Sequence, residues 1–194
     1  MFTLFRANAI RNAAELAYRR VVEHARRPGF FADCGVPDTV DGRFELISLH
    51  AFLYLHRLRR EAAAAALGQR FFDTMFADFD RSLREMGTGD LSVGREIRRM
   101  AEGFFGRIAA YDRGLAEGDS ALQPALARNL FGTAPATPGC LAAMADYVRR
   151  EATQLSGQPT ADLLAGRVSF GDPPVAEAVA EAVAAAAAAG TTGQ

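Results

Sequence analysis

The fold is decided by residues 43–60, which read RFELISLHAFLYLHRLRR. The apolar side chains of this stretch recur at helical spacing on two faces. One stripe holds Phe44, Ile47, Ala51, Leu55 and Leu58, and the other holds Leu46, Leu49 and Leu53. A helix that is apolar on two faces needs neighbours on both sides. We therefore expect this segment to be the central helix of an all-α fold, with Asp38 and Thr39 as plausible caps at its start.

The chain on either side predicts further helices, separated by Gly and Pro. Apolar residues at helical spacing predict helices over residues 5–27, 61–86, 92–117, 120–131 and 137–155, and a short one over 160–164. No segment alternates with a period of two over the length of a strand, so the sequence predicts no β-sheet. We expect a single compact domain of six or seven helices over residues 1–170. Residues 171–194, rich in Pro and Ala, are expected to form a frayed or disordered tail.

Composition narrows the class of protein. The chain has 194 residues, of which 49% are hydrophobic and 23% are charged, as in an ordinary globular domain. All 22 basic residues are Arg, which fits either a preference for bidentate contacts or the codon bias of a GC-rich genome. A net charge of −1 argues against a protein that binds DNA through its overall field. No stretch approaches the ~20 apolar residues of a membrane-spanning helix, and no secretory signal is seen, so we expect a cytoplasmic protein with reduced Cys34 and Cys140.

Residue patterns for catalysis are weak. The carboxylates Asp73, Asp78 and Asp80 suggest an alternative hypothesis, a helical metal-dependent enzyme acting on a prenyl or other apolar substrate. That chemistry needs carboxylates stacked on one helix face and a second set on a facing helix, and the second set is missing. The histidines lack the Glu-x-x-His spacing of a di-iron site, and no nucleophile elbow or phosphate-binding loop is present. We therefore expect no catalytic, cofactor-binding or metal-binding residues.

Paired aromatic residues carry more functional weight. Phe71 and Phe72 are adjacent, as are Phe104 and Phe105, and neighbouring residues on a helix point about 100° apart. Either both helices are buried on two sides, or one ring of each pair lines a groove for a hydrophobic partner. Burial on two sides is the default interpretation. The hypothesis beside it places Phe72 and Phe104 in the core, and Phe71 and Phe105 at the surface as anchors for that partner.

Five segments resemble the ubiquinol–cytochrome c chaperone family. They are GVPDTVDGRFELISLH at residues 35–50, HRLRR at 56–60, FDTMFADFDRSLREMGTGDLSVG at 72–94, MAEGFFGRIAAYD at 100–112 and, more weakly, ALARNLFG at 125–132. The Pro-Asp-Thr turn, the Leu-His pair of the next helix and the Met-Gly-x-Gly-Asp-Leu-Ser loop make the resemblance specific. The chain differs in having no Trp, because Phe52 stands where the family pattern expects one.

The resemblance implies an all-α assembly factor of the cytochrome bc1 complex that binds newly made cytochrome b. His50, Arg57 and Arg59 match the family pattern and join Phe71 and Phe105 as candidate partner-binding residues. The ribosome and the membrane surface are further candidate partners, with a position at the membrane periphery, and the oligomeric state is left open. On this interpretation the protein is a chaperone and not an enzyme.

Overall fold

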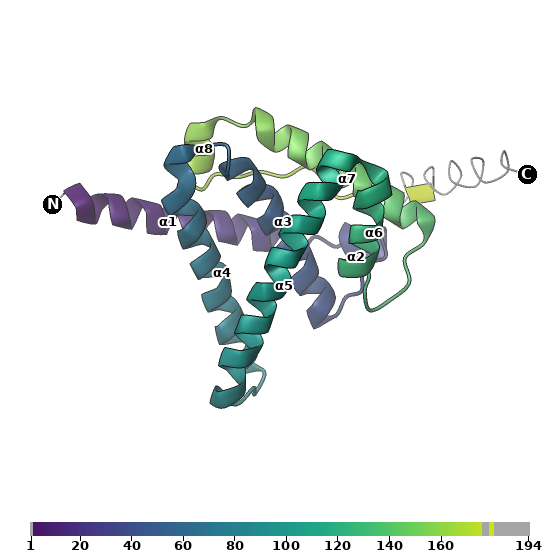
Figure 1. Cartoon of the computed structure of the whole chain (residues 1–194), viewed down its shortest axis with the longest axis horizontal. Coiled ribbons are helices and arrows are strands. Elements are labelled where there is room, and N and C mark those ends of the chain that lie inside the picture. The colour runs from purple at the N-terminus through teal and green to yellow at the C-terminus, as the bar shows by residue number, and fades with distance from the viewer. Residues whose placement is uncertain (1, 176–178, 181–194) are drawn as a thin grey trace, which may run out of the picture.

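A computed structural model of the chain describes residues 2–175 and 179–180 (Figure 1). Over these residues the chain forms helices and turns and no strand, which confirms the predicted all-α class. The elements are α1 (Phe2–Ala25), α2 (Gly29–Ala32), α3 (Val40–Leu58), the 3₁₀ turn η1 (Ala62–Ala64), α4 (Ala65–Glu85), α5 (Asp90–Glu117), α6 (Asp119–Asn129), α7 (Pro138–Gly157) and α8 (Thr160–Leu164).

Helix α3 lies at the centre, as its two apolar faces predict. It packs against α1, α4, α5 and α7, and its leucines from Leu46 to Leu53 are fully buried. Thr39 caps the helix, since its hydroxyl oxygen accepts from the backbone N–H of Gly42 at 3.1 Å. The buried carboxylate of Glu45 ties α3 to α5 by accepting from Arg107 Nε at 2.6 Å.

Two details differ from the predicted elements. Within the expected loop before α3, residues Gly29–Ala32 form the short helix α2, which buries Phe30. The helix expected over residues 61–86 begins instead with η1, because Glu61 has an extended backbone and its carboxylate is held by Arg57 and Thr160.

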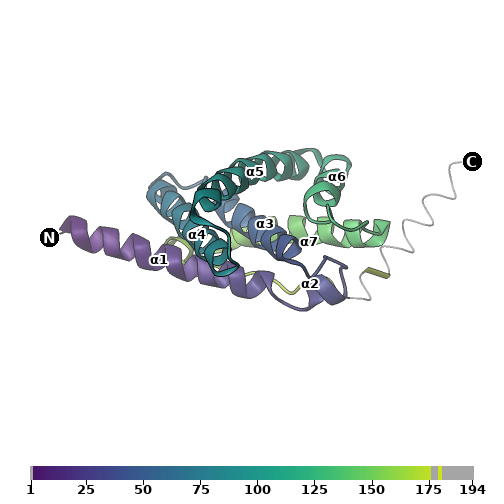
Figure 2. The same cartoon turned by 90° about the horizontal axis from the view of Figure 1, so that it is seen from below.

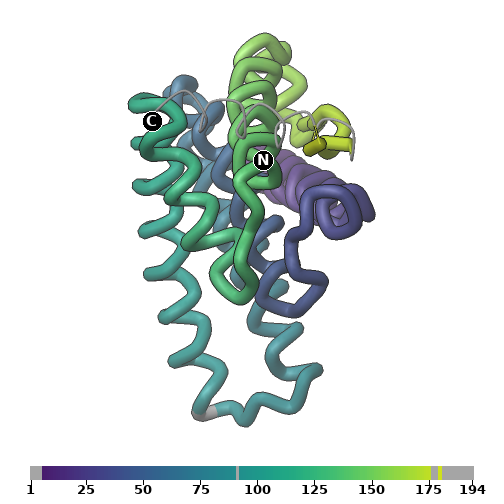
Figure 3. The backbone as a smooth tube through the Cα atoms, turned by 90° about the vertical axis from the view of Figure 1, so that its right-hand side faces the viewer, coloured from purple at the N-terminus to yellow at the C-terminus, as the bar shows by residue number. Residues whose placement is uncertain are grey.

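Helices α4 and α5 form a hairpin whose tip extends away from the rest of the molecule (Figures 1 and 3). The tip turns at Gly87, whose φ of +88° is the left-handed conformation predicted for a glycine that ends a helix. Near its base, α4 packs on α1, while the N-terminal end of α1 projects past the other helices (Figure 2). The hairpin base is therefore flanked by α1 on one side and by α3 on the other.

The segment after α8 crosses back over the body and stays packed beyond residue 170. The backbone N–H of Gly171 donates to Glu151 at 2.8 Å, and Pro173 and Pro174 are buried. The expected domain limit at residue 170 stays a prediction. Apart from residues 171–175 and 179–180, the expected tail lies outside the described residues.

Candidate functional site

An apolar groove of about 570 Å³ lies between the base of α4, the middle of α5 and the end of α3. We call it the α4–α5 groove. Its apolar lining includes Leu55, Leu58, Ala65, Gly68, Phe72, Phe104, Phe105 and Ile108. The hollow exists because η1 and the first turns of α4 contribute alanines and Gly68, which are too small to fill the space beside the phenylalanines.

The phenylalanine wall is built from stacked rings. Phe72 and Phe105 stack with their centroids 5.5 Å apart and their planes at 25°, and Phe104 is buried behind them. Phe105 remains 58% exposed, which is unusual for a large aromatic side chain. Because Phe72 holds the Phe105 ring in place, the ring is presented to a ligand with little conformational freedom to lose.

The prediction that Phe71 is exposed and Phe72 lies in the core is wrong. Phe71 is fully buried, 5.0 Å from the Tyr54 ring and 6.1 Å from the Tyr18 ring, whereas Phe72 lines the groove. The reason is that the main core lies where α4 meets α1 and α3, and Phe71 points there. For the α5 pair the prediction is confirmed, since Phe104 is buried and Phe105 is exposed.

Two charged residues border the α4–α5 groove, and both are already paired. Arg59 donates to both carboxylate oxygens of Asp112, at 2.7 and 2.6 Å. Partial burial opposes ionisation of Asp112, but hydrogen bonds from Arg59 and His56 hold its pKa below the usual range. Glu61 accepts from Arg57 and from the Thr160 hydroxyl, each at 2.9 Å, and these bonds lower its pKa. The border of the groove thus presents no unpaired charge.

The other two candidate residues lie in the interior and do not line this groove. His50 is fully buried, with its ring nitrogens 2.7 Å from the Leu46 carbonyl oxygen and 2.7 Å from the Tyr147 hydroxyl. Arg57 is also buried and donates to the Leu155 carbonyl at 3.1 Å. Both side chains therefore form hydrogen bonds to α7 in the interior and do not face an open surface.

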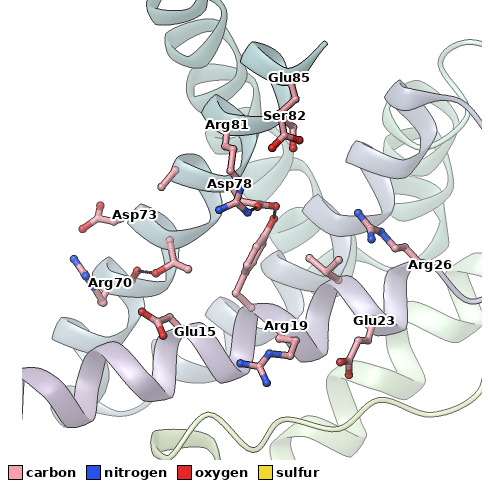
Figure 4. Close-up of a pocket in the computed structure, with 14 residues that line it drawn as sticks. Glu15, Arg19, Glu23, Arg26, Arg70, Asp73, Asp78, Arg81, Ser82 and Glu85 are labelled. Atoms are coloured by element: carbon pink, nitrogen blue, oxygen red, sulfur yellow. Dashed lines mark hydrogen bonds and ion pairs between the residues drawn. The ribbon is translucent and has the colours of Figure 1, made fainter.

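A second and larger hollow of about 830 Å³ lies between α1 and α4 (Figure 4). It is lined by side chains of both signs, among them Arg26 and Glu23 of α1 and Asp78 of α4. Tyr18 spans the gap and donates to Asp78 at 2.7 Å, and burial together with this bond raises the pKa of Tyr18.

Two carboxylates of the metal-enzyme alternative, Asp73 and Asp78, line this hollow, whereas Asp80 lies outside it. Asp78 is paired with Arg81, Asp80 with Arg84, and Asp73 accepts from Gln69. Across the described part of the chain, no three His, Cys, Asp or Glu side chains are grouped to hold a metal ion. The alternative therefore gains no support from this arrangement.

The sequence analysis missed the floor of the α4–α5 groove. The run EAAAAALG at residues 61–68 has high helix propensity, and this property alone does not predict a hollow. Small residues that follow a sharp turn beside a phenylalanine pair are the signal that a hollow can form there.

The chain is similar to known proteins in both sequence and fold. The sequence profile of the "Ubiquinol-cytochrome C chaperone" family matches residues 32–170. The chain belongs to the ubiquinol–cytochrome c chaperone family. A Xenopus laevis relative, "Ubiquinol-cytochrome-c reductase complex assembly factor 1", is 31% identical over 80% of this chain and 78% of its own length. The human protein of that name is 29% identical over 83% of this chain, which spans about half (54%) of the human protein.

A solved structure agrees with this assignment. The crystal structure of the Cbp3 homolog from Brucella abortus matches with a TM-score of 0.77 at 37% identity, covering 88% of this chain and 96% of that one. The family match begins at residue 32, so it includes α3, α4 and α5, which build the α4–α5 groove. None of the helices among residues 2–175 and 179–180 combines the length and apolar character that crossing a bilayer requires.

Proposed function

We propose that this chain is a non-enzymatic assembly factor of the ubiquinol–cytochrome c reductase complex whose client is newly made cytochrome b. Membership of the chaperone family and the names of its relatives support this role. A membrane protein that has left the ribosome and has not yet met its partner subunits exposes apolar helices that aggregate unless they are covered. The protein acts at the cytoplasmic membrane periphery, where such clients emerge.

The observation that carries the proposal is Phe105, an exposed ring that Phe72 holds in place at an apolar groove. The charges that border the groove are satisfied by internal partners, so an uncharged apolar segment enters without leaving a charge unpaired. A groove of about 570 Å³ covers only part of a client helix, which suits a factor that later releases its client.

Replacing Phe105 by Ser tests this site. We expect binding of cytochrome b to weaken by about 2 kcal/mol, or roughly 30-fold, because the complex loses an aromatic ring that the bound client would bury. The measurement is the fraction of pulse-labelled cytochrome b that co-purifies with the tagged chain. Circular dichroism and the melting temperature should stay close to those of the wild type, because Phe105 is mostly exposed.

Met86→Ser is the matched control, since Met86 is a comparably exposed apolar residue (56%) at the far end of the same hairpin. It should leave co-purification unchanged. If Phe105→Ser stays folded and retains cytochrome b as well as Met86→Ser does, the groove does not bind the client.

A further inference from the structure

The first turns of α4 separate the α4–α5 groove from another hollow, whose lining combines apolar side chains with Asn8, Arg11, Arg70 and Asp73. This hollow has a volume of about 490 Å³ and lies between α4 and the projecting end of α1. Ala7 and Ile10 form its α1 wall, and Ala66 and Gln69 form its α4 wall. Gln69 lines both hollows, so they meet over the same turn of α4.

The ridge between the two hollows is low. Ala62, Ala65, Ala66 and Gln69 are all exposed, and three of these four side chains are single methyl groups. On one side rise the rings of the α4–α5 groove, and on the other rises α1, whose N-terminal end stands clear of the body (Figures 1 and 2). The two hollows therefore form one trough with the start of α4 as its floor.

We propose that this trough holds one uncharged apolar α-helix of the client, laid along α4 between α1 and α5. This inference rests on the proposed function and specifies what the site accepts. A helix is about 10 Å wide, and small floor residues let a second helix approach closely, as Gly and Ala do between membrane helices. The paired charges at the groove end favour an uncharged segment. The α1 end offers Arg70 and Asp73, neither of which has an ion pair among the described residues, and these two charges suit a polar end of that segment.

Two other occupants are less suitable. Pro174 lies beside α2, with its carbonyl oxygen 3.5 Å from Cys34 Sγ, while the start of α4 lies at the opposite end of the body (Figure 1). A second copy of the chain offers, among its described residues, scattered exposed apolar side chains such as Val40 and Met86 outside the trough rather than a continuous apolar helix face. The test below separates these occupants from the client.

Photo-cross-linking with the full chain tests the trough. A benzophenone amino acid replaces Ala66, which lines only the α1 side of the trough, and in a control it replaces Ala77, an exposed residue in the charged hollow on the same helix. We expect cytochrome b to be labelled from residue 66 at least about tenfold more than from residue 77, because aromatic and apolar contacts concentrate at the centre of an interface. Labelling of the chain's own tail, of a second copy, or of nothing would overturn the proposal.

Ala66→Glu gives an independent readout. The exposed substitution should leave the fold intact and lower cytochrome b co-purification about tenfold, since it places a charged carboxylate against an apolar helix, even where Arg70 four residues further along α4 pairs with it. If Phe105→Ser loses the client but Ala66→Glu does not, the proposed function stands and the extension of the site towards α1 fails. If neither variant loses the client, the proposed site fails in both its parts, while cytochrome b remains the client and binds elsewhere on the chain.

Discussion

At the scale of single residues, the Tyr147 hydroxyl joins two buried imidazoles. The Leu46 carbonyl can only accept, so His50 Nδ1 must donate to it, at 2.7 Å, which leaves His50 Nε2 as an acceptor for the Tyr147 hydroxyl at 2.7 Å. The Tyr147 oxygen then accepts from His24 Nε2, at 2.9 Å. This chain of hydrogen bonds needs a neutral His50, because its Nε2 must accept, and it ties α1, α3 and α7 together.

We predict from this chain that acid destabilises the protein. Burial, and then the charge of Arg27, lowers the pKa of His24 from 6.5 to about 4, and burial, and then His24, lowers the pKa of His50 from 6.5 to about 3. Between those values and 6.5 the unfolded chain binds protons that the folded protein excludes. The free energy of unfolding should therefore fall as pH drops from about 6.5 to 4, by roughly 1.4 kcal/mol per pH unit for each imidazole.

Urea unfolding at pH 7 and pH 5 measures this effect. The double variant His24→Gln, His50→Gln should be less stable at pH 7 but lose most of the difference between the two pH values. Equal stability of the wild type at pH 7 and pH 5 would show that the two imidazoles are not held neutral in the folded protein.

At the scale of elements, the corner between α5 and α6 depends on one close approach. A Cβ atom added at Gly114 of α5 would lie 2.8 Å from the Leu122 Cα and Cδ1 atoms of α6, both closer than any ordinary contact. Leu122 is fully buried, and its backbone cannot move without shifting α6. The packing of α6 on α5 therefore requires glycine at position 114.

We predict that Gly114→Ala destabilises the protein by about 1–3 kcal/mol, the cost of overpacking a close contact. Gly94→Ala in the same helix is the matched control, since nothing lies within 4 Å of the Cβ that it adds. That variant should be more stable than the wild type by up to about 1 kcal/mol, because alanine favours the helix. Thermal unfolding of both variants checks the pair, and a Gly114→Ala protein as stable as Gly94→Ala would contradict the proposed close approach.

At the scale of the whole molecule, the body supports the α4–α5 hairpin, and the hairpin carries most of the groove. The body, built around α3, positions the base of the α4–α5 hairpin, and the aromatic wall and the small-residue floor meet at that base. Most of the groove's lining comes from α3, α4 and α5, and the turn that holds Arg59 and Glu61 completes it.

Deleting the gene tests the function of the molecule in the cell. We expect cytochrome b and the assembled ubiquinol–cytochrome c reductase complex to fall several-fold in the membranes, because an uncovered client is degraded. The wild-type gene and the Met86→Ser variant should restore both levels, and Phe105→Ser should not. An unchanged amount of the complex under respiratory growth would refute the assembly role.

Local pattern in the sequence determined the helices of this protein and its family. Helix formation depends on neighbours three and four residues apart, so the two-faced stretch at residues 43–60 and the Thr39 cap could be identified without a structure. The family resemblance could also be identified from the sequence, because it rests on contiguous segments.

The tertiary structure alone decided which face of each helix is inside. Helical spacing predicts that Phe71 and Phe72 point about 100° apart, but it does not predict which of the two points into the core. In the folded protein α1 and α3 pack on the side of α4 that carries Phe71, so Phe71 is the buried ring. The same holds for His50 and Arg57, whose partners Tyr147 and Leu155 lie about a hundred residues further along the chain. The groove arises from the meeting of α3, α4 and α5, and no single segment encodes a space between elements.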